Sequence, residues 1–165
     1  MKKILILIAV SFMLNACERD DICIDPITPK LTIRFYNNDE PTTLKSVSNI
    51  EVRIDTISEP YTDNSQTIRS STDSIAVPLR VDQTVTKILL TENSTSDTDR
   101  NTDTLEVSYT PESIFVSRSC GYKDVFNNVS YRIIPESDGG NWLKGIETVT
   151  VNIENEDQAN VKIFH

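Results

Sequence analysis

Apolar side chains recur at every second position in short stretches along most of this chain, and this period constrains the fold more than any other feature. Residues 31–36 (LTIRFY) are a clear case, because Leu31, Ile33 and Phe35 alternate with three less apolar neighbours. A period of two is typical of a strand with one face in a hydrophobic core. The pattern predicts roughly nine short strands, at 31–36, 50–54, 75–79, 85–90, 105–109, 114–116, 129–133, 149–153 and 161–163.

Helices are not expected beyond an isolated turn near residues 111–113. Strands that follow one another without intervening helices predict an all-β domain. Strands of about five to seven residues favour an antiparallel β-sandwich, immunoglobulin-like or related, over a barrel. Two polar stretches between the strands, residues 59–73 and 91–104, are long enough to be mobile tips or binding loops.

The first 16 residues have the features of an export signal. Lys2 and Lys3 precede about 11 apolar-rich residues, whereas a membrane-spanning helix takes roughly 20. The segment ends in LNAC at 14–17, which resembles the bacterial lipobox, although Asn15 is larger than the usual residue. We expect a lipoprotein signal peptide at 1–16, a lipidated acidic tether at 17–30 and a β-sandwich domain at 31–165. The alternative is an ordinary secreted protein in which Cys17 is a chance cysteine.

Acyl chains on Cys17 would anchor the chain to a membrane, and we expect this to be the outer membrane. One chain gives only reversible binding, so the two or three chains of a bacterial lipoprotein are needed for stable anchoring. The acidic segment 18–21 (ERDD) resembles the surface-export signal of Bacteroidota lipoproteins. This slightly favours the cell surface over the periplasmic face of that membrane.

The charge of the chain argues against nucleic acid as a partner. The full sequence has a formal charge of −9, and its first 16 residues contain two lysines and no acid. The mature chain therefore carries 14 basic and 25 acidic residues, a formal charge of −11. Such a charge repels phosphate backbones and anionic headgroups. It is also what a soluble exported domain needs to resist self-association.

Two cysteines remain if Cys17 is acylated. An exported protein meets an oxidising environment, so Cys23 and Cys120 are expected to form a disulfide. The bridge would fix the tether to the domain. The alternatives are a buried thiol at Cys120 with an exposed one at Cys23, or a thiol pair that binds a metal.

The sequence indicates no catalytic centre, and we expect neither enzyme activity nor a cofactor. The single histidine, His165, is terminal, where a relay of Ser, His and Asp would lack support. The small number of glycines, 4, argues against a glycine-rich phosphate loop. Chemistry that uses two carboxylates stays open, because the chain has 25 acids but no feature selects a pair.

Three weaker site signals remain. Oxygen side chains alternate at Asp97, Asp99, Asn101 and Asp103, as in a calcium loop, but the loop lacks the usual glycine and contains a cation. A solvated hairpin tip is the alternative. Trp142 could stack on a sugar at a ligand site or plug one end of the sandwich. Three tripeptides resemble Bacteroidota O-glycosylation acceptors, with the modified hydroxyl at Thr56, Ser74 or Thr104.

Three segments, CERDDIC at 17–23, LTIRFYN at 31–37 and VSRSCGY at 116–122, resemble an uncharacterised family of small, mainly flavobacterial, Bacteroidota lipoproteins whose domain has no assigned function. The resemblance implies an outer-membrane lipoprotein with Cys23 and Cys120 as a recurrent pair, and it carries over no catalytic or ligand-binding residue. Our first hypothesis is a non-catalytic envelope module that contacts another envelope protein. The alternative is a glycan- or ligand-binding sandwich.

Overall fold

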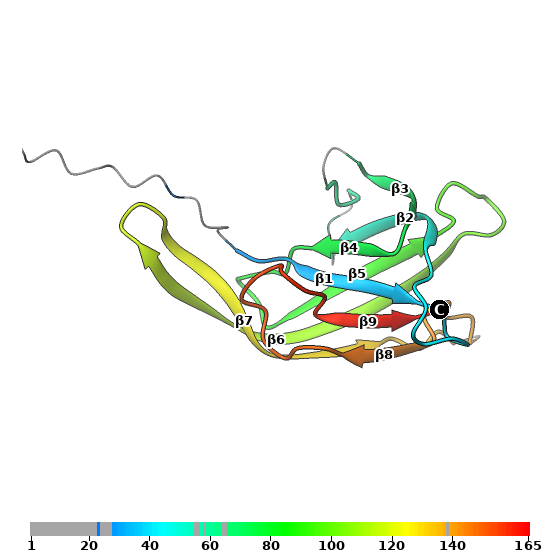
Figure 1. Cartoon of the computed structure of the whole chain (residues 1–165). Coiled ribbons are helices and arrows are strands. Elements are labelled where there is room, and N and C mark those ends of the chain that lie inside the picture. Colours follow the sequence, from blue (N-terminus) through cyan, green and yellow to red (C-terminus); the bar gives the residue numbers. More distant parts are fainter. Residues whose placement is uncertain (1–22, 24–27, 55–56, 58, 64–65, 138) are drawn as a thin grey trace, which may run out of the picture.

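The computed structural model describes residue 23 and residues 28–54, 57, 59–63, 66–137 and 139–165. This part of the chain contains nine strands and no helix (Figure 1). The strands are β1 (Leu31–Tyr36), β2 (Val47–Ile54), β3 (Ile68–Thr72), β4 (Ser74–Val77), β5 (Val85–Glu92), β6 (Asn101–Ser117), β7 (Gly121–Ile133), β8 (Gly145–Thr148) and β9 (Val161–Phe164).

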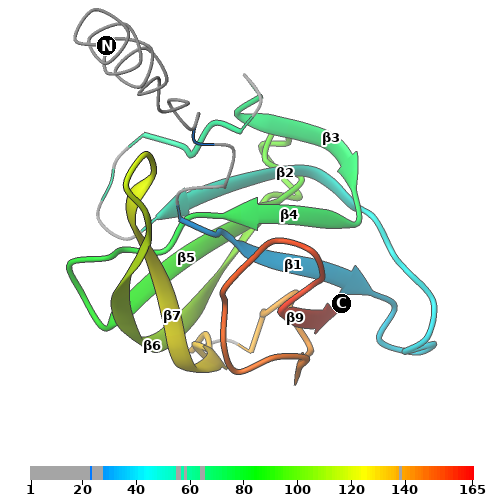
Figure 2. The same cartoon turned by 60° about the vertical axis from the view of Figure 1, so that its left-hand side comes forward.

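Two sheets face each other in a sandwich-like arrangement, which confirms the predicted all-β fold. One sheet has four strands in the order β4-β1-β9-β8, and the other has five in the order β3-β2-β5-β6-β7. Neighbouring strands are antiparallel except β1 and β9, which run parallel. Figure 2 shows the two layers from a second direction, with β1 and β4 in front of β2 and β5.

The core lies between the two sheets and comes from the inward positions of the alternating stretches. Leu31, Ile33 and Phe35 of β1 are fully buried, and so are Ile88 and Leu90 of β5. Burying a side chain of this size contributes about 1.5–3 kcal/mol. The alternation seen in the sequence therefore corresponds to the real division between core and surface in the central strands.

Several strand positions differ from the prediction. Residues 105–109 and 114–116 belong to one 17-residue strand, β6, and the turn expected at 111–113 lies inside it. The predicted strand 149–153 is irregular, although Ile153 forms an isolated bridge with Phe126 of β7. Within it, Thr150 and Asn152 bond to each other through side chain and backbone. Such local bonds compete with the extended ladder.

Both long polar stretches are shorter as loops than the sequence suggests. Strand β3 lies inside the stretch 59–73 and pairs with β2, and strands β5 and β6 leave only residues 93–100 between them. Residues 28–30, which the sequence assigns to the tether, already contact the domain. Pro29 is buried, and the Lys30 backbone N–H donates to the Glu156 carboxylate at 2.9 Å.

Candidate functional site

Strands β6 and β7 continue beyond the sandwich as a two-stranded arm (Figure 1). Strand β5 pairs with β6 only as far as Ser108, whereas β6 and β7 stay paired to Ser117 and Gly121. We call residues 110–127 the hairpin arm. Over this length β6 has a partner strand on one side only, which is why Pro111 is tolerated there.

The tip of the hairpin arm is a short turn, Arg118 to Cys120, between the paired residues Ser117 and Gly121. Gly121 has a φ of 72°, a left-handed conformation that closes many three-residue hairpin loops. The Cys120 backbone N–H donates to the Ser117 hydroxyl at 3.0 Å. This local geometry fixes the position of Cys120 at the outer end of the arm.

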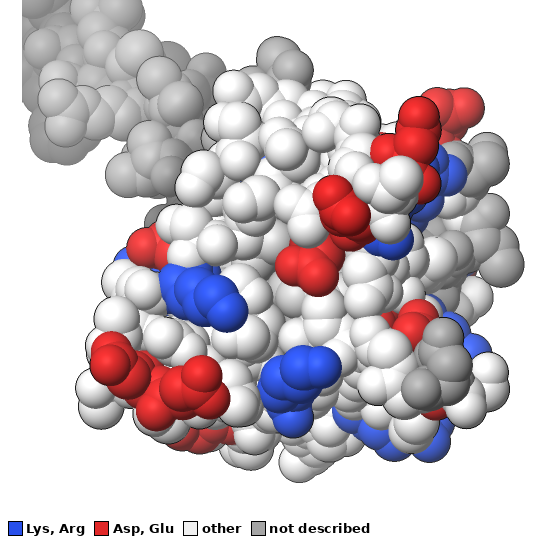
Figure 3. Space-filling model, turned by 90° about the vertical axis from the view of Figure 1, so that its right-hand side faces the viewer, with Lys and Arg blue, Asp and Glu red and all other residues white. Residues whose placement is uncertain are grey.

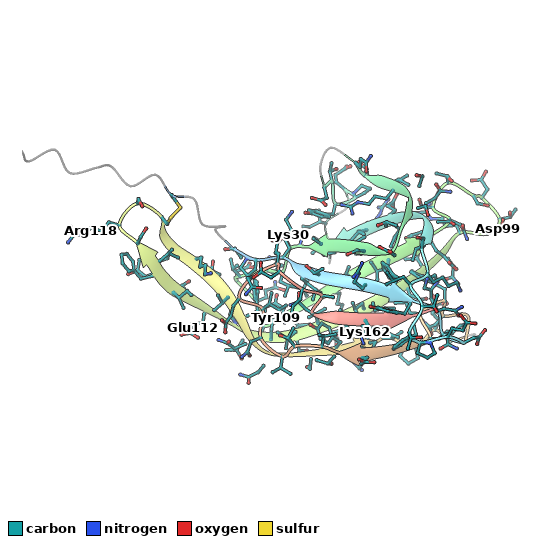
Figure 4. All side chains as sticks on the ribbon, viewed as in Figure 1. Lys30, Asp99, Tyr109, Glu112, Arg118 and Lys162 are labelled. Carbon is teal, nitrogen blue, oxygen red and sulfur yellow. A yellow bond between two sulfur atoms is a disulfide. The ribbon has the colours of Figure 1, made fainter. Side chains whose placement is uncertain are left out.

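A disulfide joins Cys120 to Cys23, as predicted, with 4.9 Å between the Cα atoms and 97 positions between them in the sequence (Figure 4). In the chain-entropy model a closed loop of this length contributes about 4–5 kcal/mol to stability. A second contact lies nearby, since the Asp124 backbone N–H donates to the Thr28 hydroxyl at 3.3 Å. The chain that precedes the domain is thus attached to the arm and to its tip.

The hairpin arm carries an exposed aromatic pair. Phe115 and Tyr122 lie opposite each other on β6 and β7, with ring centroids 5.4 Å apart in an edge-to-face arrangement. Phe115 is 59% exposed and Tyr122 is 66% exposed, the highest values among the exposed large hydrophobic side chains of the described residues. Neighbouring large apolar groups left in water mark interaction surfaces more often than isolated ones do.

An ionic cluster lies beside a small hollow that residues of β2, β3 and β4 line. The Asp63 carboxylate pairs with Arg69 and with Lys30, the latter at 3.3 Å. Burial lowers the pKa of Lys30, but hydrogen bonds with Tyr61 and Asp63 outweigh it, so the pKa lies above its usual value. The hollow has a volume of about 20 Å³, which is room for one water molecule and not for an organic ligand.

Trp142, a candidate stacking residue, belongs to the core. It is 5% exposed, and its indole N–H donates to the Leu90 carbonyl at 3.1 Å. Its ring contacts Phe35, with centroids 6.1 Å apart, and His165, with centroids 5.5 Å apart. The structure thus favours the interpretation as a plug at the end of the sandwich, and the indole presents no open face on which a sugar could stack.

His165 is held more firmly than a terminal residue was expected to be. Its ring also meets Phe35 edge-on, and its Nε2 lies 3.2 Å from the Lys45 carbonyl oxygen. Burial lowers its pKa, and the nearby Lys45 charge adds to that, while the bond to the carbonyl opposes it. Its neighbours are aromatic rings and a backbone carbonyl, so the contacts of the ring are those of a packed structural group.

The four residues of the calcium hypothesis do not converge. Asp103 is fully buried in β6, where one carboxylate oxygen accepts the Leu143 backbone N–H at 2.7 Å and the other has no hydrogen-bond partner. Asn101 donates to the Gly140 carbonyl, and Asp99 accepts from Ser96 in the turn before β6. Among the described residues, no three His, Cys, Asp or Glu side chains come close enough to hold a metal ion. The alternative interpretation, a solvated hairpin tip, therefore applies to residues 93–100.

The buried Asp103 carboxylate affects its neighbour on β5. Burial, and then the Asp103 charge, raise the pKa of Glu92, and the positive charges of Lys45 and Lys144 only partly offset this. Figure 3, which looks at the end of the molecule opposite the hairpin arm, shows acidic and basic side chains interspersed among neutral ones. The described residues on this face therefore do not form a single-sign patch of the kind that steers a charged partner.

Some predicted sites lie outside the described residues. They are Cys17, the predicted signal peptide, most of the tether and the glycosylation candidate Thr56. The other two glycosylation candidates, Ser74 and Thr104, are partly buried strand residues. No helix in the portion that the structure describes has the length and hydropathy needed to cross a membrane.

The sequence pattern missed the hairpin arm and its aromatic pair. It assigned inward positions to Ile114 and Val116, so that Phe115 fell on a supposed polar face. The available signal was the turn SRSCG at 117–121 between two apolar stretches, which is typical of a hairpin.

Comparison with known proteins places the chain in a family. Residues 51–165 match the family of unknown function DUF6452, and because this is well over half of the sequence, the chain belongs to that family. No curated protein and no solved structure matches it.

Proposed function

We propose that this member of the DUF6452 family is a lipid-anchored, non-catalytic module of the bacterial outer membrane. Acyl chains on Cys17 hold it there, and its sandwich contacts another envelope protein. The cell surface is slightly favoured over the periplasmic face because of the acidic residues 18–21. The Cys23–Cys120 disulfide is the observation that carries the proposal.

The disulfide supports a role in presentation at a membrane. Cys23 follows Cys17 by six positions, and six residues span at most about 21 Å in any conformation. A lipid on Cys17 is therefore within that distance of the tip of the hairpin arm. A flexible tether alone would leave the domain to tumble, whereas this bridge limits its orientations and supports a fixed binding geometry.

The setting of the histidine supports a role without catalysis. The His165 imidazole packs against Phe35 and Trp142 and approaches the Lys45 carbonyl. A general base must instead present its nitrogen to a substrate. The buried carboxylate of Asp103 is likewise engaged with a backbone N–H on the core side of β6.

Metabolic labelling tests the anchor. Cells that express the wild-type chain should incorporate labelled palmitate into it and retain it in the outer-membrane fraction. A Cys17→Ser variant should lose the label and leave that fraction. Equal fractionation of the two chains, with no label in either, contradicts the proposal.

Crosslinking in intact cells tests the protein partner. A photoreactive amino acid at Asp99, far from the hairpin arm in Figure 4, and another at Glu147 probe two exposed parts of the sandwich. We expect a specific adduct in the acylated protein and its loss in the Cys17→Ser chain. Absence of a specific adduct from several such positions argues against a protein partner while leaving the anchor intact.

A further inference from the structure

We infer that Phe115 and Tyr122 enter the interfacial layer of the bilayer that carries the anchor and form a second, reversible membrane contact. The inference rests on the proposed function for its location. It goes further by naming the surface of the domain that faces the lipid.

The chemistry of the pair suits a membrane interface. Tyrosine is enriched where the hydrocarbon meets the headgroups, because one end of its ring is apolar and the other is hydrated. The Phe115 ring adds apolar area beside it. Both rings are more exposed than buried, and each contacts the other edge to face. The pair thus offers apolar area that the fold itself does not cover.

The position of the pair suits the anchor. Tyr122 follows Cys120 by two residues, and the disulfide places Cys23 at the same end of the arm. Since Cys23 is six residues from the proposed lipidation site, the pair lies on the part of the domain that the anchor holds closest to the bilayer. The arm also projects away from the sandwich (Figures 1 and 2), so it can approach lipid while the acidic domain stays in water.

The order of charges along the hairpin arm points in the same direction. Its acids, Glu112 and Asp124, lie on the domain side of the aromatic pair and bond to Asn127 and Ser113. Arg118 is exposed at the tip beyond the pair, as Figure 4 shows. A cation at the outer end is attracted to lipid phosphates, whereas carboxylates there would be repelled. This arrangement favours a bilayer over an uncharged protein surface.

Fluorescence quenching by lipid tests the inference. A Phe115→Trp or Tyr122→Trp variant of the acylated chain is reconstituted in phosphatidylcholine and phosphatidylethanolamine vesicles whose acyl chains carry bromine. We expect a loss of the added emission and a blue shift relative to the same chain without vesicles. An Asp99→Trp variant, at the opposite end of the molecule, and the parent chain with buried Trp142 are the controls and should keep their emission.

The outcomes separate the inference from the proposed function. Failure of the acylated chain to float with vesicles contradicts the anchor. A chain that floats without quenching at position 115 or 122 contradicts the lipid contact, and a protein adduct from a photoreactive residue at 115 in cells would assign the pair to a protein instead. A mature chain attached by an N-terminal hexahistidine tag to nickel-chelating lipid tests the lipid contact of Phe115 and Tyr122 without the native anchor. Absence of quenching in that chain also refutes the lipid contact.

Discussion

Replacement of Trp142 gives the sharpest test of how the end of the sandwich is built. The ring is 5% exposed, lies against Phe35 and His165, and donates to the Leu90 carbonyl. Truncation of a buried aromatic side chain to alanine costs about 3–5 kcal/mol. A Trp142→Phe variant keeps most of the ring but loses the hydrogen bond, and the lost bond alone should cost about 1 kcal/mol.

The assay is urea unfolding of the unacylated Cys17→Ser chain, followed by far-ultraviolet circular dichroism because the variants lack tryptophan. Tyr122→Ala is the matched control, since it removes an aromatic ring that is 66% exposed, and loss of its cross-strand contact with Phe115 should cost no more than about 1 kcal/mol. If the free energy of unfolding of Trp142→Ala lies within about 1 kcal/mol of that of the parent chain, the ring does not close the end of the sandwich. An unchanged stability combined with loss of binding on a glycan array would restore the sugar-stacking hypothesis.

Three other changes should have measurable effects on unfolding. Replacing Cys23 and Cys120 together by serine should lower the free energy of unfolding by about 4–5 kcal/mol under non-reducing conditions, because the disulfide that joins positions 97 apart no longer restricts the unfolded chain. Equal urea midpoints for the variant and the parent chain would contradict this. Asp103→Ala should cost about 1–3 kcal/mol in urea titrations, because the buried Leu143 N–H loses its acceptor. Burial lowers the pKa of His165 in the folded chain, so the folded state binds fewer protons than the unfolded state and stability falls as the pH drops below about 6.5. Unfolding measured between pH 7 and 5.5 should show a smaller fall for His165→Gln, and identical slopes would refute the assignment.

Strands β1, β4 and β9 could be predicted because each has one buried face, although β4 lies at the edge of its sheet. The positions 31–36, 75–77 and 161–163 alternate between core and surface in the structure as they do in the sequence. Strand β3 was missed because it is an edge strand with mostly exposed side chains. Its extended form depends on backbone pairing with β2, which leaves no apolar pattern.

Alternation also misled where local bonds override it. Val149 and Val151 alternate with polar residues, yet both are exposed, at 42% and 56%, and only Ile153 is buried. The Val149 and Thr150 N–H groups both donate to the Asn160 carbonyl instead of to a neighbouring strand. The period alone does not distinguish such a looped segment from a strand.

The calcium pattern failed for a related reason. Alternate oxygen side chains converge on an ion only if the backbone wraps around it, as in a calcium loop. Here β6 begins at Asn101, so Asn101 and Asp103 sit on an extended strand while Asp97 and Asp99 stay in the preceding turn. The strand boundary, which sequence spacing does not mark, separates the candidate ligands.

The hairpin arm shows the limit of reasoning from hydrophobic pattern. Such patterns report which side chains are buried in the chain's own core. In the arm only Val125 and Phe126, at its base, are buried, and none of residues 112–123 is. Its strands are held by pairing with each other, by a turn that Gly121 closes and by a disulfide 97 positions away in sequence. A cross-strand aromatic pair adds about 0.5–1 kcal/mol to such a hairpin, a modest gain for two large rings left in water. The arm's aromatic surface is therefore better explained by what lies outside the chain than by what it contributes to folding.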